Sequence, residues 1–180
     1  MTLLLSGLVL WIAAHLFRRV MPRQREAMGK WGRPVVAILI VISVVMMIFG
    51  YREAEETFLY VLPGWSWHLN NLLMLVALFL MDVGRVRGVV RTWIRHPMLT
   101  GVLVWSVAHL LVNGDLPSLV LFGGMAVWAV LEMVVINRAE GEWQRPERGT
   151  WFGDGKILVL SLVLYAVIVG IHGWLGHPVF

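Results

Sequence analysis

Six long apolar runs, separated by short polar loops, constrain the fold of this chain more than any other feature. They lie roughly at Thr2–Phe17, Pro34–Gly50, His68–Val83, Pro97–Val112, Ser118–Ile136 and Ile157–Trp174. Of the 180 residues, 59% are hydrophobic and 14% are charged, whereas a water-soluble domain carries about 25% charged residues. A helix needs about 20 apolar residues to cross a bilayer. The pattern therefore predicts an all-α polytopic membrane bundle of about six transmembrane helices, in one domain covering residues 1–180.

The basic residues predict how the spans are oriented. Fourteen of the fifteen lysines and arginines lie in three loops, at residues 18–33, 84–96 and 137–156, and the remaining one is Arg52. Cytoplasmic loops carry such an excess of positive charge. We therefore expect these loops in the cytoplasm and both termini outside it. Because the charge serves as a topology signal, the expected partner is the lipid bilayer and no nucleic acid. The chain has no cysteine, which excludes disulfides and thiolate metal sites.

Polar residues inside the apolar runs fall into two layers. Near the predicted cytoplasmic side lie His15, Asp82, Arg95, His96 and Glu132. Near the other side lie His68, Asn70, Asn71, His109, Asn113 and His172. Ionisable residues are costly in a membrane and often mark a site. The first layer could pin helices together through ion pairs, or form a pocket that binds a charged group through Arg95 and His96.

The second layer is rich in histidine, and His109 is the histidine most deeply embedded in an uncharged run. Neutral imidazole is a common metal ligand, and helical bundles often hold cofactors between facing helices. The second layer is therefore compatible with haem held between facing helices, and equally with histidines that only pack the helices through hydrogen bonds.

The stretch RHPMLTGVLVWSVAHLLVNGD, at residues 95–115, resembles the NnrU family of bacterial membrane proteins. Further matching segments are Ala14-His15-Leu16, Gly50-Tyr51, Leu121-Phe122-Gly123 and His172-Gly173-Trp174-Leu175-Gly176. The resemblance implies a protein of the bacterial inner membrane that is linked to nitrite and nitric-oxide respiration. It also implies kinship with the plant 15-cis-ζ-carotene isomerase, a haem b protein that isomerises a polyene.

The resemblance to that isomerase implies bound haem b with His15 and His109 as its ligands, and His96 matches a histidine of the shared motif. If the protein is an enzyme, this kinship implies a haem-dependent cis–trans isomerase with an apolar, lipid-like substrate.

The depths of the histidines leave the ligand pair open. Two axial ligands of one iron place their nitrogens about 4 Å apart. His15 lies one turn from the cytoplasmic end of its run, whereas His109 lies about 20 Å from the cytoplasmic start of its own. Depth alone pairs His109 with His172 or His68. The pair His15 and His109 therefore rests on the family, and the rival pair His109 and His172 rests on depth.

Two other functions fit parts of the sequence. Arg95-His96-Pro97 followed by Gly101 also resembles a motif of membrane methyltransferases that bind S-adenosylmethionine on the cytoplasmic side, although the motif tyrosine is Leu99 here. In that case Arg95, His96 and Glu132 would hold the cofactor. Alternatively, the protein is a non-catalytic assembly or regulatory subunit whose polar residues only pack helices.

Overall fold

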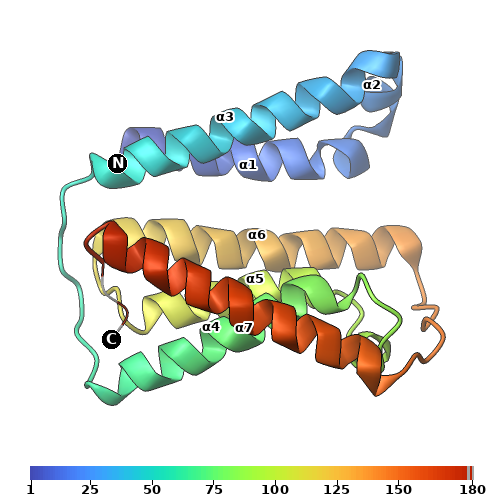
Figure 1. The fold of residues 1–180 in the computed structure, drawn as a ribbon. Coiled ribbons are helices and arrows are strands. Elements are labelled where there is room, and N and C mark those ends of the chain that lie inside the picture. The colour runs from blue at the N-terminus through green and yellow to red at the C-terminus, as the bar shows by residue number, and fades with distance from the viewer. Residues whose placement is uncertain (178, 180) are drawn as a thin grey trace. The chain divides into compact units, whose positions relative to one another are not determined.

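The computed structural model describes residues 1–177 and 179, and its long elements are all α-helices (Figure 1). They are α1 (Thr2–Val20), α2 (Pro22–Ala27), α3 (Gly32–Arg52), α4 (Trp65–Val83), α5 (Pro97–Leu110), α6 (Leu116–Glu140) and α7 (Trp151–Trp174). Within the described residues, α1, α3, α4, α6 and α7 are long and apolar enough to cross a membrane. The predicted polytopic helical membrane bundle is confirmed.

The remaining apolar helix, α5, is short. It has 14 residues and is therefore about 21 Å long at 1.5 Å per residue, against about 30 Å for the hydrocarbon core. The helix ends at Leu110, two residues before the predicted end of this span. The backbone N–H groups of Leu111 and Asn113 then bond to carbonyls in the last turn, as the chain turns toward Gly114.

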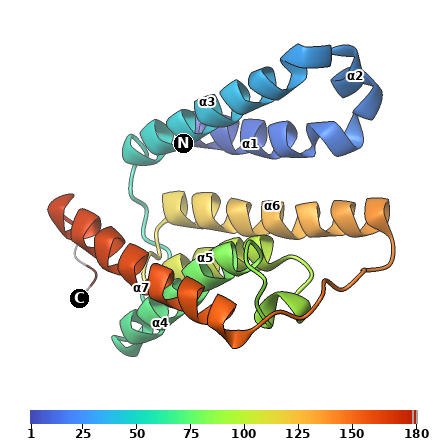
Figure 2. The ribbon, with the colours of Figure 1, turned by 45° about the vertical axis from the view of Figure 1, so that its right-hand side comes forward.

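The helices group into two compact units. The first unit comprises Met1–Tyr60 and Gly114–Gly141, and contains α1, α2, α3 and α6. Helices α1 and α3 lie side by side as a hairpin (Figures 1 and 2), because two glycines allow their backbones to approach closely. A Cβ atom at Gly7 would lie 2.9 Å from the backbone nitrogen of Met47, and one at Gly50 would overlap the backbone of Leu4. Helix α6 packs against α1.

The second unit comprises Val61–Asn113 and Glu142–Phe180, and contains α4, α5 and α7. Helices α4 and α5 form its hairpin, and α7 packs against α4. Gly101 of α5 again allows a close approach, because a Cβ atom there would lie 2.8 Å from the carbonyl oxygen of Ala77. A small apolar core of Leu80, Val83 and Ile157 joins α4 to α7.

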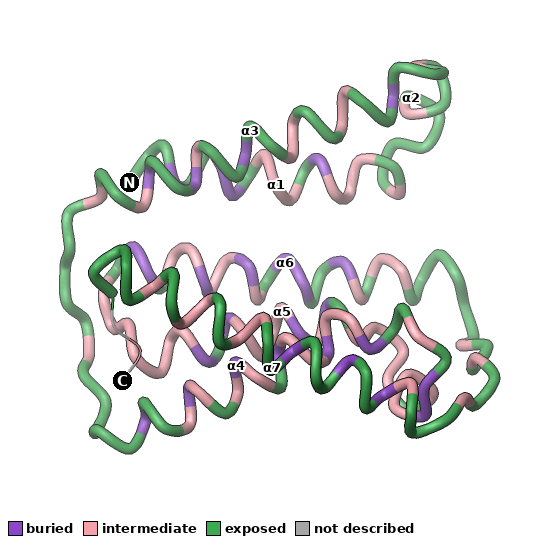
Figure 3. The backbone as a smooth tube through the Cα atoms, viewed as in Figure 1, coloured by how far each residue is buried: buried purple, intermediate pink, exposed green. Residues whose placement is uncertain are grey.

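Long apolar faces remain exposed on α3 and α7 (Figure 3). Examples are Ile38, Val41 and Ile48 on α3, and Val159, Val163 and Val167 on α7. In water such faces would drive association, whereas in a bilayer they contact lipid tails. The exposure pattern therefore agrees with helices that cross a membrane.

Asp115 fixes the start of α6. Its Oδ1 accepts a hydrogen bond of 2.8 Å from the backbone N–H of Ser118, and its Oδ2 accepts one of 2.7 Å from the Ser118 hydroxyl. The Tyr51 hydroxyl of α3 lies 2.8 Å from the same Ser118 oxygen. An N-terminal cap of this kind satisfies a backbone donor that the helix leaves unpaired.

Candidate functional site

Three histidines of the spans share one geometry: Nδ1 of each lies within hydrogen-bond distance of the carbonyl oxygen four residues earlier. The bonds run from His15 to Trp11 (2.9 Å), from His109 to Trp105 (3.0 Å) and from His172 to Ile168 (2.9 Å). A carbonyl oxygen only accepts, so Nδ1 carries the hydrogen. In the neutral imidazole, Nε2 then bears the lone pair. Metal-binding histidines are oriented by such a bond from their other ring nitrogen.

Two of these histidines belong to the second unit. His109 comes from α5 and His172 from α7, and both are partly buried. The Trp105 ring packs beside His109, with 4.9 Å between ring centroids. The structure therefore places two of the histidines that the sequence selected on different helices of one unit.

His15 lies in the first unit, among aromatic rings. Its ring centroid is 4.1 Å from that of Trp11 on α1 and 4.9 Å from that of Trp128 on α6, and the two tryptophan rings are 5.2 Å apart. Trp128 is only 4% exposed. The two indoles therefore hold the imidazole in a fixed position between α1 and α6.

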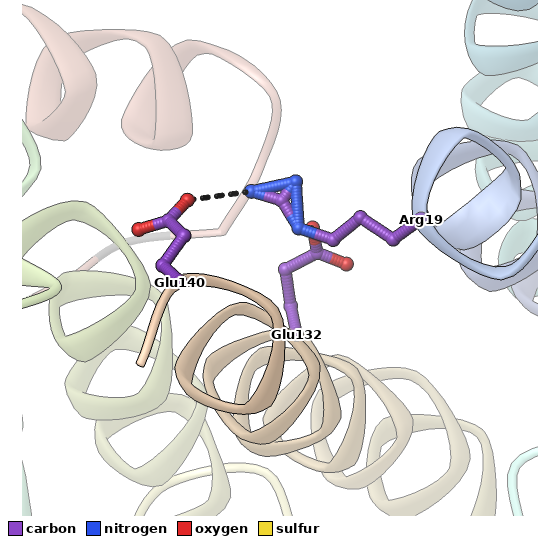
Figure 4. Close-up of polar contacts among 3 residues, drawn as sticks. All are labelled: Arg19, Glu132 and Glu140. Atoms are coloured by element: carbon purple, nitrogen blue, oxygen red, sulfur yellow. Dashed lines mark ion pairs between the residues drawn. The ribbon is translucent and has the colours of Figure 1, made fainter. Parts of the chain in front are cut away.

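Glu132 lies one turn beyond Trp128 on α6 and forms an ion pair with α1. Its Oε1 is 3.9 Å from Arg19 Nε, and Arg19 Nη2 is 3.6 Å from Glu140 Oε1. Figure 4 shows Arg19 reaching from α1 toward both carboxylates. The Glu132 side chain is 12% exposed, against 59% for Glu140. Trp128, one turn away on α6, contacts the His15 ring, so an intramembrane carboxylate, a guanidinium and an imidazole lie in one cluster.

Several polar atoms of this cluster lack a hydrogen-bond partner. Seven buried side-chain nitrogen or oxygen atoms of the described residues have none, and four of the seven lie here. They are Trp11 Nε1, Arg19 Nε, Trp128 Nε1 and Glu132 Oε2. Buried polar groups normally find a protein, water or ligand partner. These atoms of α1 and α6 are three donors and one acceptor, which a small polar molecule such as water could satisfy.

The residues expected to form a pocket on the cytoplasmic side are distributed over both units. Asp82, Arg95 and His96 belong to the second unit, where Asp82 Oδ1 lies 3.3 Å from Arg85 Nε. The carbonyl of His96 accepts hydrogen bonds of 2.9 Å from the backbone N–H and the hydroxyl of Thr100. Glu132 belongs to the first unit and has Arg19 as its cation. A common pocket of these four residues stays a prediction.

An apolar pocket of about 420 Å³ lies in the second unit. It is lined by Leu75, Val76, Phe79, Val90, Trp151, Asp154, Gly155 and Leu158. Its α7 residues end at Leu158, about 21 Å along the helix from His172. An apolar molecule held in this pocket would therefore lie at the opposite end of α7 from the histidine pair.

The donor set suits haem better than a bare metal ion. No group of three or more histidine, cysteine, aspartate or glutamate side chains that could hold a metal ion occurs in the part of the chain that the structure describes. The porphyrin supplies four nitrogens to its iron, so the protein needs to add only one or two axial imidazoles. His15, His109 and His172, each oriented through Nδ1, fit that role, and the pair His109 and His172 shares one unit.

Sequence reasoning missed three residues of the first unit's cluster: Trp11, Arg19 and Trp128. A signal was present, because Trp11, His15 and Arg19 follow one another at intervals of four residues, as do Trp128 and Glu132. Residues spaced by four share one face of a helix. Two such stripes, one on each of two spans, indicate a polar helix–helix contact.

A protein-family model described as NnrU protein matches residues 3–179 of the chain. No curated protein and no solved structure matches the chain.

Proposed function

The chain belongs to the NnrU family, and we propose that it is a multi-pass protein of the bacterial inner membrane that binds haem b through histidines of its spans. Its role would be a redox or sensing task linked to nitrogen oxides. The observation that carries the proposal is the shared geometry of His15, His109 and His172, in which Nδ1 is bonded and Nε2 carries the lone pair.

His109 would be one of the residues that hold the haem, and His172 of the same unit would be the other. The Trp105 carbonyl orients His109 and the Ile168 carbonyl orients His172. The Trp105 ring covers one side of His109 and would help keep water from the iron. Haem bound there would supply a one-electron redox centre, and it could take up a small diatomic ligand only if one of the two histidines were released. The pair His15 with His109 remains the family-based alternative.

Isomerisation of an apolar substrate is the less favoured role. The apolar pocket of the second unit could hold such a substrate, but its distance along α7 from His172 would separate substrate and iron by about 21 Å. An isomerase would therefore need a different substrate site, or the other ligand pair.

Haem content of purified variants tests the proposal. The protein is expressed in haem-replete cells, purified in detergent, and assayed for haem per polypeptide by visible absorption. We expect His109→Ala to lose most of its haem, and either His172→Ala or His15→Ala to lose it as well, which identifies the second ligand. His177→Ala, at an exposed position beyond the end of α7, is the matched control and should keep its haem.

Two outcomes would overturn the proposal. One is a colourless wild-type protein, and the other is an unchanged haem content in His109→Ala. The methyltransferase alternative predicts calorimetric binding of S-adenosylmethionine that depends on Arg95 and His96. The non-catalytic alternative predicts no binding of either cofactor, so the two measurements together separate all three functions.

A further inference from the structure

The connection between α1 and α3 encloses a basic pocket. Its volume is about 710 Å³, and its lining residues are Arg18, Pro22, Arg25, Glu26, Gly29, Lys30 and Arg33. Four of these side chains are cationic and one is anionic, so the pocket carries an excess of three positive charges. This pocket lies within the first unit and includes none of the histidines considered above.

The cations of the pocket are not neutralised by carboxylates. Among the described residues, Arg19 and Arg85 form ion pairs with carboxylates within 4 Å, but none of the four cations of the pocket does. Lys30 instead places its Nζ 5.7 Å from the ring centroid of Trp31. Like charges gathered at one place repel one another, and an anion among them removes that repulsion. The pocket is therefore complementary to an anionic group.

Gly32 fixes one of these cations in place. The guanidinium of Arg25 lies so close to Gly32 that a Cβ atom at this position would overlap Nη1. Arg25 is also the least exposed of the four cations, since Arg18, Lys30 and Arg33 are all exposed. A glycine at the first position of α3 thus lets Arg25 pack against the helix and form one wall of the pocket.

The position of the pocket points to the membrane surface as the source of the anion. Arg18 lies in the last turn of α1 and Arg33 in the first turn of α3, so the pocket lies where two spans leave the bilayer. Val20, Met21 and Trp31 beside it are exposed, with Trp31 64% exposed. Tryptophan at such a place anchors a protein among the lipid headgroups. A phosphate of the adjacent leaflet lies at the same depth.

We propose that this basic pocket binds the phosphate of an anionic membrane phospholipid, through Arg18, Arg25, Lys30 and Arg33. The cytoplasmic leaflet is rich in anionic lipids, and each basic side chain near it strengthens binding roughly fivefold. The proposal is independent of haem, because it concerns other residues and needs no cofactor.

Thermal unfolding of the delipidated full-length protein in a non-ionic detergent tests this site. Phosphatidylglycerol should raise the unfolding temperature in a saturable way, and phosphatidylcholine should not. The variant Arg25→Gln/Arg33→Gln removes two charges and should weaken the apparent affinity about twenty-fivefold. The matched control Arg145→Gln/Arg148→Gln removes two exposed charges from another predicted cytoplasmic loop and should bind like the wild type.

Three further samples complete the test. Arg25→Lys/Arg33→Lys keeps the charge and should retain most of the binding, which guards against a merely misfolded glutamine variant. Gly32→Ala displaces Arg25 without changing any charge and should weaken binding. Inorganic phosphate should cause no shift at the lipid's concentration.

Equal effects of the two lipids, or equal losses in the two double-glutamine variants, would overturn the proposal. An equal shift with inorganic phosphate would assign the pocket to a soluble anion and would overturn it as well.

Discussion

Arg19 is the cation that pairs with the buried Glu132 in the first unit. It is 27% exposed in its side chain and is the cation that neutralises Glu132 inside the span. Removing one partner of a fully buried pair costs about 3–5 kcal/mol. Because Arg19 is partly exposed, we expect Arg19→Met to lower the free energy of unfolding by about 1–3 kcal/mol, since Glu132 is left without its cation. Unfolding in mixed detergent micelles measures this difference.

Glu140→Gln is the matched control for Arg19→Met, because it removes the other, exposed half of the same ion-pair network. Glu140 is 59% exposed in its side chain, and an exposed pair contributes roughly 0–1 kcal/mol. We therefore expect a change well below that of Arg19→Met. Equal losses in the two variants would contradict the prediction, because they would mean that the pair with Glu132 contributes no more than the exposed pair with Glu140.

The polar residues of the site were partly predictable from the sequence. His15, His109 and His172 stood out because polar side chains interrupt apolar runs. Arg19 did not, because it was counted with the basic loop at residues 18–33, whereas α1 continues to Val20. A sequence gives the depth of a residue along its helix, but it does not show which helix faces meet. The contact between Arg19 and Glu132 was hidden for that reason.

At the scale of whole elements, most helices extend beyond their predicted spans. Helix α7 begins at Trp151, six residues before the predicted start at Ile157. The predicted span began only after the charged residues Asp154 and Lys156. In the structure Asp154 is buried in the first turn of α7, and its Oδ2 accepts a hydrogen bond of 2.7 Å from the backbone N–H of Val89. Charge marks the limit of an apolar run, whereas hydrogen bonds and packing decide where a helix begins.

The α1–α3 hairpin gives a test at this scale. Gly50→Ala adds a methyl group that must displace the backbone of Leu4, and overpacking of this kind costs about 1–3 kcal/mol. Gly123→Ala on α6 is the matched control, because the nearest atom to its added Cβ would be Leu119 Cδ1 at 3.9 Å. In that open position alanine should stabilise the helix by about 0.5–1 kcal/mol relative to glycine.

Unfolding free energies of the two glycine variants should therefore change in opposite directions. A loss of stability in both would show that helical glycines of this unit are sensitive for a reason other than close approach. A gain in both would show that α1 and α3 separate easily enough to accept a methyl group.

At the scale of the whole molecule, backbone hydrogen bonds between loops support six crossings. The N–H of Leu59 bonds to Gly114 O at 2.7 Å, and the N–H of Leu116 bonds to Thr57 O at 2.8 Å. The loop before α4 and the loop after α5 therefore lie on the same side of the membrane. If α4 crosses the membrane, as its length allows, we expect α5 to cross back, although it is only 14 residues long.

Backbone hydrogen bonds also join the loop after α4 to the loop before α7. The N–H of Gly149 bonds to Gly88 O at 3.0 Å, and that of Thr150 bonds to Arg87 O at 3.2 Å. Both loops are among the three that the basic residues place in the cytoplasm. The pairing of the loops on two sides was thus predictable, because hydropathy and charge act through composition alone, whereas the crossing by α5 stays a prediction. The orientation, and the single domain over residues 1–180, stay predictions.

Cysteine labelling tests the orientation directly, because the chain has no cysteine of its own. Single variants Gln24→Cys, Glu55→Cys and Glu147→Cys place a thiol at exposed positions in three different loops. With a membrane-impermeant maleimide on intact spheroplasts, we expect labelling of Glu55→Cys only, and labelling of the other two after permeabilisation. If α5 did not cross, the loop after α6 would move to the outer side, and Glu147→Cys would react in intact spheroplasts. Labelling of Gln24→Cys and Glu147→Cys, but not of Glu55→Cys, in intact spheroplasts would instead mean that the whole orientation is inverted, and would move the basic pocket to the outer leaflet.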